Sequence, residues 1–86
     1  MQAKPEPTMK DIVLFIAQQL VNNPDAVQVT ETECTTVTLF ELRVAQEDFG
    51  RVIGRYGRTV GATRVILNAV ATRAGRRVNL EVIEEK

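Results

Sequence analysis

The chain has 86 residues, 44% of them hydrophobic and none of them Trp, so it is expected to form one small domain with an aliphatic core. A single cysteine excludes an internal disulfide, and without His there are too few ligands for a zinc site, so we expect no metal or cofactor. The net charge is zero, which by itself argues against strong binding to nucleic acid. No signal-peptide pattern and no long apolar run are present, which indicates a soluble intracellular protein.

Residues 1–7 contain two prolines and no periodic pattern, so they are predicted to form a flexible tail. Thr8 and Asp11 have the spacing of a capping box, which predicts that a helix begins there. The core stripe of this helix has helical spacing and consists of Met9, Ile12, Val13, Ile16, Ala17, Leu20 and Val21. Leu14 and Phe15 fall off the stripe, so either the tail or a loop covers them or they form a partner surface. Asn22 and the residues up to Asp25 end the helix, because a residue before proline avoids the helical conformation.

Two strands are predicted next. Val27 and Val29 alternate with polar residues, and the polar stretch 31–36 indicates a turn in which Cys34 is an incidental thiol. Residues 36–44 are rich in β-branched and aromatic side chains and form the second strand. Apolar residues occur on both of its faces, which is typical of a central strand: Phe40, Leu42 and Val44 on one, Val37 and Leu39 on the other.

A short helix is expected from Gln46 through Ile53, with acidic residues in its first turn. A longer helix follows from about Arg58 to Ala74 and is capped by Gly75. Its predicted inner stripe is Val60, Thr63, Ile66, Leu67, Val70, Ala71 and Ala74, and Gly61 weakens it by roughly 1 kcal/mol relative to Ala. Residues 77–83 alternate as the last strand.

The order helix, strand, strand, helix, helix, strand predicts an α+β fold. The first two strands are joined by a short link and should pair antiparallel. The second and third are joined through two helices, which favours parallel pairing by a right-handed crossover. The expected result is a three-stranded mixed sheet with the helices packed on one face.

The Gly54-Arg55-Tyr56-Gly57 turn between the last two helices is the strongest functional signal. Two glycines three residues apart permit a sharp turn and close backbone approach, and a helix N-terminus with unpaired N–H groups follows. Between Phe49 and Leu80 there are seven arginines and no acidic residue, although folding can still bring acids beside them. These features together favour binding of a phosphodiester backbone.

The same residues resemble a known family. A Gly-x-x-Gly turn between two short helices, in this order of elements, is the hallmark of a type II KH domain. The chain is similar to small bacterial single-KH proteins of the KhpA type on three stretches: Leu42-Arg43-Val44-Ala45 with Glu47-Asp48 and Gly50 to Thr59, Ile16-Ala17 with Leu20 to Pro24, and Gly75 to Glu81. It departs from the family pattern at Gln46, Tyr56 and Gly61.

The resemblance implies a KH domain over residues 8–84, with a C-terminal tail of residues 85–86. It further implies a cytoplasmic RNA-binding protein, not an enzyme, that acts as an RNA chaperone or post-transcriptional regulator linked to cell-envelope homeostasis and cell shape. Its partners would be single-stranded RNA and either itself, as a homodimer, or a second KH protein of the KhpB (Jag/EloR) type. No membrane and no small-molecule substrate are expected.

In the predicted site, Gly54 and Gly57 let the turn press against the sugar-phosphate backbone, and Arg55 and Arg58 neutralise phosphates. Tyr56 either stacks on a base or is an exposed turn residue.

Further members are expected next to the turn. Arg51 reaches the strand one turn earlier, and Arg43 helps to read base edges. Val52 and Ile53, with Val60, either line an apolar groove beside the second strand or belong to the core.

The sequence leaves two rival functions to consider. An adaptor would use the KH surface for protein pairing, with RNA contact incidental. An enzyme is disfavoured, because the turn lacks the spacing of a phosphate-binding P-loop and no base lies near Cys34 in the chain. A dimer is physically sensible because two linked sites bind more tightly than one, with Leu14 and Phe15, or Val65 and Ala69, as the predicted interface.

Overall fold

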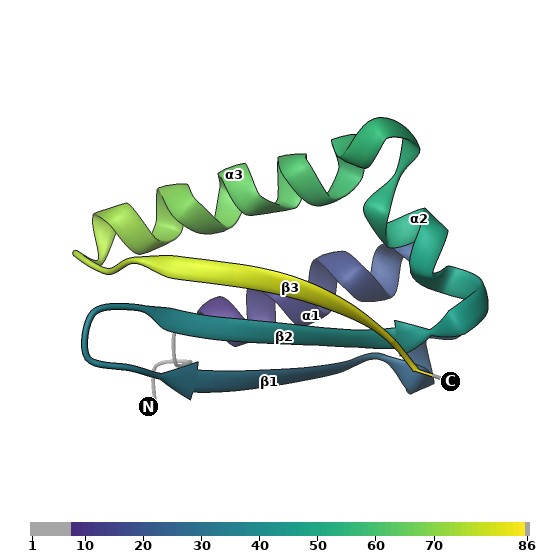
Figure 1. The fold of residues 1–86 in the computed structure, drawn as a ribbon, viewed down its shortest axis with the longest axis horizontal. Coiled ribbons are helices and arrows are strands. Elements are labelled where there is room, and N and C mark those ends of the chain that lie inside the picture. The colour runs from purple at the N-terminus through teal and green to yellow at the C-terminus, as the bar shows by residue number, and fades with distance from the viewer. Residues whose placement is uncertain (1–7, 86) are drawn as a thin grey trace, which may run out of the picture.

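The computed structural model describes residues 8–85 as helices on one face of a three-stranded sheet (Figure 1). The order of the elements is α1 (Met9–Leu20), β1 (Gln28–Glu33), β2 (Thr38–Ala45), α2 (Phe49–Ile53), α3 (Arg58–Arg73) and β3 (Val78–Glu85). β2 lies in the centre, antiparallel to β1 and parallel to β3, as predicted. The expected tail of residues 1–7 lies outside the described residues, and β3 extends one residue into the expected C-terminal tail.

The core forms between the helices and the inner face of the sheet. β2 alternates buried and half-buried residues along its whole length, because only one of its faces is covered by helices. The buried hydrophobic residues come from every helix and strand: Val13, Ala17, Val27, Val29, Phe40, Leu42, Val44, Val52, Val60, Leu67, Ala71 and Leu80. No helix in residues 8–85 is long and apolar enough to cross a membrane.

α1 begins as its sequence predicts. The Asp11 N–H donates to Thr8 Oγ1 and the Thr8 N–H donates to Asp11 Oδ2, both at 3.1 Å, which completes a capping box. Leu14 is half-buried and packs against the core. Phe15 remains 63% exposed, so no described segment covers it.

The hairpin of β1 and β2 differs from the prediction in its bounds. β1 continues to Glu33, where a turn was expected, because the antiparallel ladder pairs Glu33 with Thr38. The turn is therefore short and is closed by the Cys34 N–H, which donates to the Val37 carbonyl at 2.8 Å. The polar side chains of β1 are tolerated since they are exposed at the edge of the sheet.

The buried face of α3 contains fewer residues than predicted. Ile66 is 48% exposed and Ala74 is exposed, so both were wrongly placed on the inner stripe. Ile66 is turned about 100° away from Leu67 around the helix, which carries it off the core. The helix end follows the prediction: Gly75 has φ +72°, and the Arg76 and Gly75 N–H groups donate to the Ala71 and Thr72 carbonyls.

Candidate nucleic-acid interface

The turn between α2 and α3 depends on Gly54 for two separate reasons. Its backbone, at φ +77° and ψ 167°, lies in a region that is essentially restricted to glycine. A Cβ placed there would also lie 2.2 Å from Thr59 Oγ1 and 2.8 Å from the Thr59 backbone nitrogen. At Gly54 the atoms that approach the backbone closely therefore belong to the first turn of α3.

Gly57 serves the turn differently. It is left-handed, with φ +72°, but a Cβ built on it would meet nothing within 4 Å. Its outer side is open, so a ligand can approach the backbone closely there. Its N–H donates to the Gly54 carbonyl at 3.1 Å, which closes the turn, and it caps α3 without a side-chain hydrogen bond.

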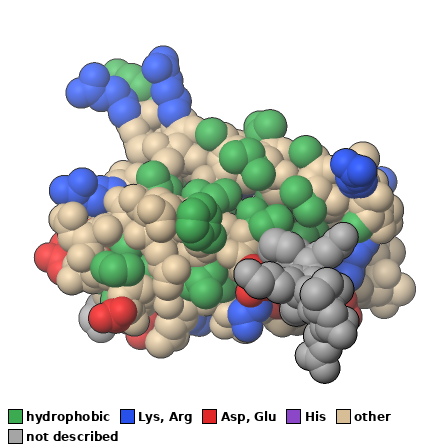
Figure 2. All heavy atoms as spheres, turned by 180° about the vertical axis from the view of Figure 1, so that it is seen from behind, with side chains coloured by type: hydrophobic (Ala, Val, Ile, Leu, Met, Phe, Trp, Pro, Cys, Tyr) green, Lys and Arg blue, Asp and Glu red, His purple; other side chains and the backbone are tan. Residues whose placement is uncertain are grey.

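Tyr56 occupies an unusual conformation. It is the one non-glycine residue with positive φ in the described chain, and 89% of it is exposed. The turn is the protrusion at the upper left of Figure 2, where a hydrophobic side chain stands between basic ones. At this exposure the ring of Tyr56 contributes nothing to the core, so its side chain is free to contact other molecules.

Arginines surround this protrusion without acidic partners. Arg51, Arg55 and Arg58 are all exposed, and none of them has a carboxylate within 4 Å in residues 8–85. The two ion pairs of the described chain, Arg43 with Glu85 and Arg76 with Glu33, are elsewhere. The turn therefore keeps a local positive field at zero net charge.

Asp48 was not recognised in the sequence as a buried residue. Its side chain is fully buried just before α2, and it accepts hydrogen bonds from the Asn22 and Asn23 N–H groups and from Asn23 Nδ2, at 3.0 to 3.1 Å. Burial alone would raise the pKa of Asp48, but these hydrogen bonds and the nearby Arg51 charge hold that pKa below its ordinary value. Asp48 thus anchors the start of α2 to the end of α1.

The segment of Asn22 and Asn23 also binds the second acidic residue before α2. Asp48 is fully engaged by the Asn22–Asn23 segment, and Glu47 accepts a hydrogen bond from Asn23 Nδ2 at 2.7 Å. One signal for this anchor is present in the sequence. Two adjacent asparagines follow α1, and their polar groups need hydrogen-bond partners wherever they are buried.

Arg43 lies away from the turn, and two residues that were predicted to belong either to a groove or to the core are buried. Arg43 sits on the outer face of the sheet and pairs with Glu85 at 3.8 Å, because it alternates with the buried Leu42 and Val44. Val52 and Val60 are buried, so for both the core interpretation holds. Ile53 is half-buried beside the turn and keeps some accessible surface.

The strand beside α2 and α3 is β3, not the second strand as predicted. Between α3 and β3 lies a hollow of about 320 Å³, lined by Arg64, Leu67, Asn68 and residues 78–81. Arg64 crosses it and donates from Nε and Nη2 to the Leu80 carbonyl, at 3.2 and 2.9 Å. These polar residues were missed, since helical periodicity alone does not tell which strand faces an exposed helix position.

Comparison with known proteins gives consistent matches. The model of the KhpA/KhpB KH domain matches residues 10–82. The RNA-binding protein KhpA of Chlamydia pneumoniae is 42% identical over 78 residues, which cover 91% of this chain and all of that protein. The RNA-binding protein KhpA of Aquifex aeolicus is 46% identical over 76 residues, covering 88% of this chain and 96% of its own.

Among solved structures, the fold is similar to part of Era. Era in complex with MgGDPNP and nucleotides 1506–1542 of 16S ribosomal RNA matches with a TM-score of 0.64 and 18% identity over 98% of this chain. Aquifex aeolicus Era bound to GDP and aluminium fluoride gives the same TM-score with 22% identity over 88% of this chain. The chain spans only 36% and 29% of those two Era chains, so this likeness concerns the fold of one domain.

Proposed function

The chain belongs to the KhpA/KhpB family of KH domains, and from this membership we propose that it binds single-stranded RNA at the Gly54–Gly57 turn. Its α+β architecture is the type II KH fold expected from the sequence. The family consists of RNA-binding proteins and not of enzymes. The observation that carries the proposal is the protruding turn itself, whose arginines have no acidic partner in residues 8–85.

The backbone of the RNA lies against the open side of Gly57. Arg55 and Arg58 flank that side and neutralise phosphates, and the uncapped N-terminus of α3 adds N–H donors. Arg51, which lies one helical turn before Arg55 in the chain, contacts the same RNA strand. Tyr56 stacks on a base, a contact worth ~1–3 kcal/mol.

The bases lie toward β3. Ile53 supplies apolar surface next to the turn, and the hollow between α3 and β3 supplies the amides of Asn68 and Asn79. β3 is an edge strand, so apart from the Leu80 carbonyl, which accepts from Arg64, its outer backbone groups have no partner strand and can pair with base edges. Arg43 plays no part in this arrangement, because it lies on the other face of the sheet.

We further propose that the protein acts in the cytoplasm as a dimer or with a second KH protein of the KhpB type. The clamp of a single KH domain contacts few phosphates, so its affinity is modest and sensitive to salt. Two linked sites overcome that limit. By family resemblance the role would be that of an RNA chaperone or post-transcriptional regulator linked to cell-envelope homeostasis.

The first test is fluorescence anisotropy of labelled single-stranded RNA at two salt concentrations. The variant Arg55→Asp/Tyr56→Asp makes the turn more negative and keeps both glycines. Lys10→Asp/Gln19→Glu is the matched control, since it changes the charge equally at exposed positions of α1. We expect the turn variant to lose binding and the control to retain it, with unchanged circular dichroism for both.

The other outcomes separate the alternatives. Equal binding by wild type and turn variant would overturn the turn as the RNA site. If the wild type binds no RNA alone or with a KhpB-type partner, the chain is an adaptor that uses its exposed apolar surface for protein pairing.

A further inference from the structure

Two hollows follow one another along the line where α3 faces β3, and a third adjoins them between the β1–β2 turn and the segment that joins α3 to β3. The middle one, of about 450 Å³, shares Asn68 and Asn79 with the hollow beside Arg64. It shares Arg76 and Arg77 with the third hollow, of about 530 Å³, at the far end of α3. The shared linings make these hollows one continuous α3–β3 groove, which runs from Arg64 to the β1–β2 turn at the end of the molecule opposite the glycine turn.

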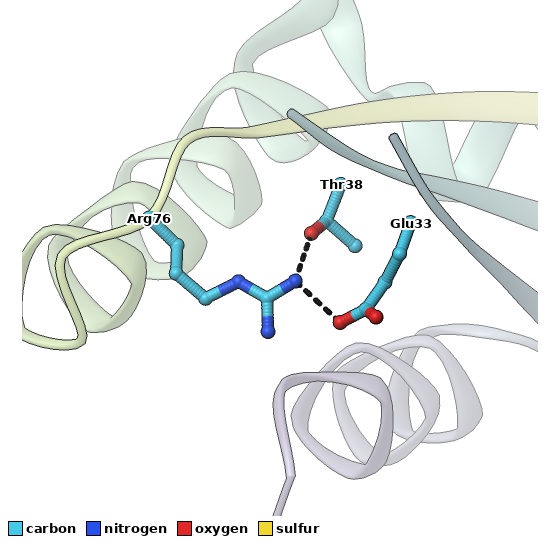
Figure 3. A network of polar contacts seen from close by, with 3 residues as sticks. All are labelled: Glu33, Thr38 and Arg76. Atoms are coloured by element: carbon cyan, nitrogen blue, oxygen red, sulfur yellow. Dashed lines mark hydrogen bonds and ion pairs between the residues drawn. The ribbon is translucent and has the colours of Figure 1, made fainter. Parts of the chain in front are cut away.

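The far end of the groove is positively charged. Arg76 donates to Glu33 and to the hydroxyl of the buried Thr38, so its charge is balanced and its position is held (Figure 3). Its neighbour Arg77 is exposed and has no carboxylate within 4 Å in residues 8–85. Thr36, from the β1–β2 turn, lies on the opposite wall and offers a hydroxyl.

Glu81 lines the hollow beside Arg64, but no acidic residue of the described chain lines the middle or the far hollow. Between the two arginine-bearing ends the groove presents the neutral amides of Asn68 and Asn79, each with donors and an acceptor. A negatively charged chain that also carries hydrogen-bonding edges fits this lining better than a small anion does. That description matches single-stranded nucleic acid.

We infer that Arg77 and Thr36 form a second phosphate site, which binds the same RNA strand beyond the part held by the turn. This inference rests on the proposed function. α3 has 16 residues and is therefore about 24 Å long. The four nucleotides that a KH turn clamps cover only about 14 Å at a stacked spacing of roughly 3.4 Å. An RNA that fills the whole groove is therefore longer than the clamp footprint.

The test compares random-sequence RNA tetramers with decamers. We expect the wild type to bind decamers more tightly, and Arg77→Glu to remove most of this gain while leaving tetramer affinity unchanged. Its slope of log affinity against log salt for decamers should fall by about 0.7 for one lost phosphate contact. Arg77→Gln should show the same pattern more weakly.

Arg73→Glu is the matched control. It makes the same charge change on exposed surface four residues away, but Arg73 does not line the groove. We expect it to keep the length gain. In ¹⁵N-resolved NMR spectra of the wild type, tetramers should shift resonances at the turn and in the hollow beside Arg64, and only decamers should also shift Thr36 and Arg77.

Each remaining outcome overturns the inference. If the length gain survives in Arg77→Glu, the decamer bridges two turns in a dimer and not two ends of one groove. If Arg73→Glu and Arg77→Glu weaken decamers equally, only the general field acts. Decamer binding without shifts at the far end excludes the site while leaving the turn intact. If neither length binds to the wild type, the proposed function fails and this inference fails with it.

Discussion

Gly54 and Gly57 are equivalent in the motif but not in the structure. Gly54 faces into the molecule against Thr59, and Gly57 faces outward. We expect Gly57→Ala to cost about 1–2 kcal/mol, the price of a left-handed backbone for a residue with a Cβ. Gly54→Ala should cost more, because its methyl group also collides with Thr59. Urea denaturation measures both values, and equal losses would contradict the two distinct roles.

Asp48 makes a prediction that depends on pH. Its folded-state pKa is lowered from 3.8, so its carboxylate stabilises the fold above that value and the contribution disappears as the pH falls through the folded-state pKa. Asp48→Asn should therefore lower the thermal midpoint at neutral pH, since an amide nitrogen replaces one acceptor for the Asn22 and Asn23 donors.

The control for Asp48 is Glu47→Gln, which alters one exposed hydrogen bond and should change the midpoint little. The midpoints of wild type and Asp48→Asn are expected to converge in acid. A constant difference between them from neutral pH down to pH 2 would show that the ionised carboxylate is not what holds Asn22 and Asn23.

At the scale of elements, α3 contains one residue of low helix propensity that packing does not require. Gly61 lies inside the helix, and a Cβ there would meet nothing within 4 Å. We expect Gly61→Ala to stabilise the protein by about 1 kcal/mol, because Ala has the higher helix propensity and restricts the unfolded chain. Thermal unfolding in the absence of RNA is the measurement. An unchanged or lower midpoint would mean that the domain needs the glycine for another reason.

The elements themselves were predictable where a local pattern defines them. The capping box at Thr8, the glycine cap after α3 and the alternation of β2 each depend on residues that are close in the sequence. The same alternation predicts that Arg43 lies on the other face of the sheet from Leu42 and Val44. This was a reason not to place it in the site. Asp48 was different, because its partners are 25 and 26 residues away and only the folded chain brings them together.

Packing decided the remaining differences. Ile66 and Leu67 are both strong hydrophobic residues on α3, and only contact with the sheet distinguishes the exposed one from the buried one. β1 runs three residues further than its apolar pattern because β2 offers it a ladder partner. The lining of the α3–β3 groove depends on which strand lies next to α3. The topology of the fold sets this, so a local sequence pattern could not predict the polar residues of the groove.

Across the whole molecule, eleven basic and eleven acidic residues give zero net charge, but the two kinds are unevenly distributed over the surface. The outer face of the sheet brings Glu41 and Glu81 side by side in register and holds Arg43 against Glu85. In the described chain the arginines of the turn have no acidic partner, and at the far end of the groove Arg77 has none while Arg76 pairs with Glu33. An RNA strand on the helical side would therefore meet an attractive field, while the sheet face would repel it.

The exposed apolar surface of α3 completes the proposal of a dimer. Val65 is 68% exposed and Ile66 48% exposed, with alanines beside them, whereas α1 exposes one large hydrophobic residue, Phe15. The larger patch is the better candidate for a second copy, since burying contiguous apolar area drives association. We therefore expect α3 and not α1 to form the interface.

Val65→Glu/Ala69→Glu should convert a dimer into a monomer of 9.6 kDa in sedimentation and weaken binding of long RNA by about 100-fold or more, because two linked sites become one. Thr30→Glu/Thr32→Glu adds the same charge on exposed positions of β1 and should leave both quantities unchanged. A dimer that survives the α3 variant but dissociates in Phe15→Glu would move the interface to α1. A wild type that sediments as a monomer at all concentrations would reject self-association and make the second KH protein the required partner.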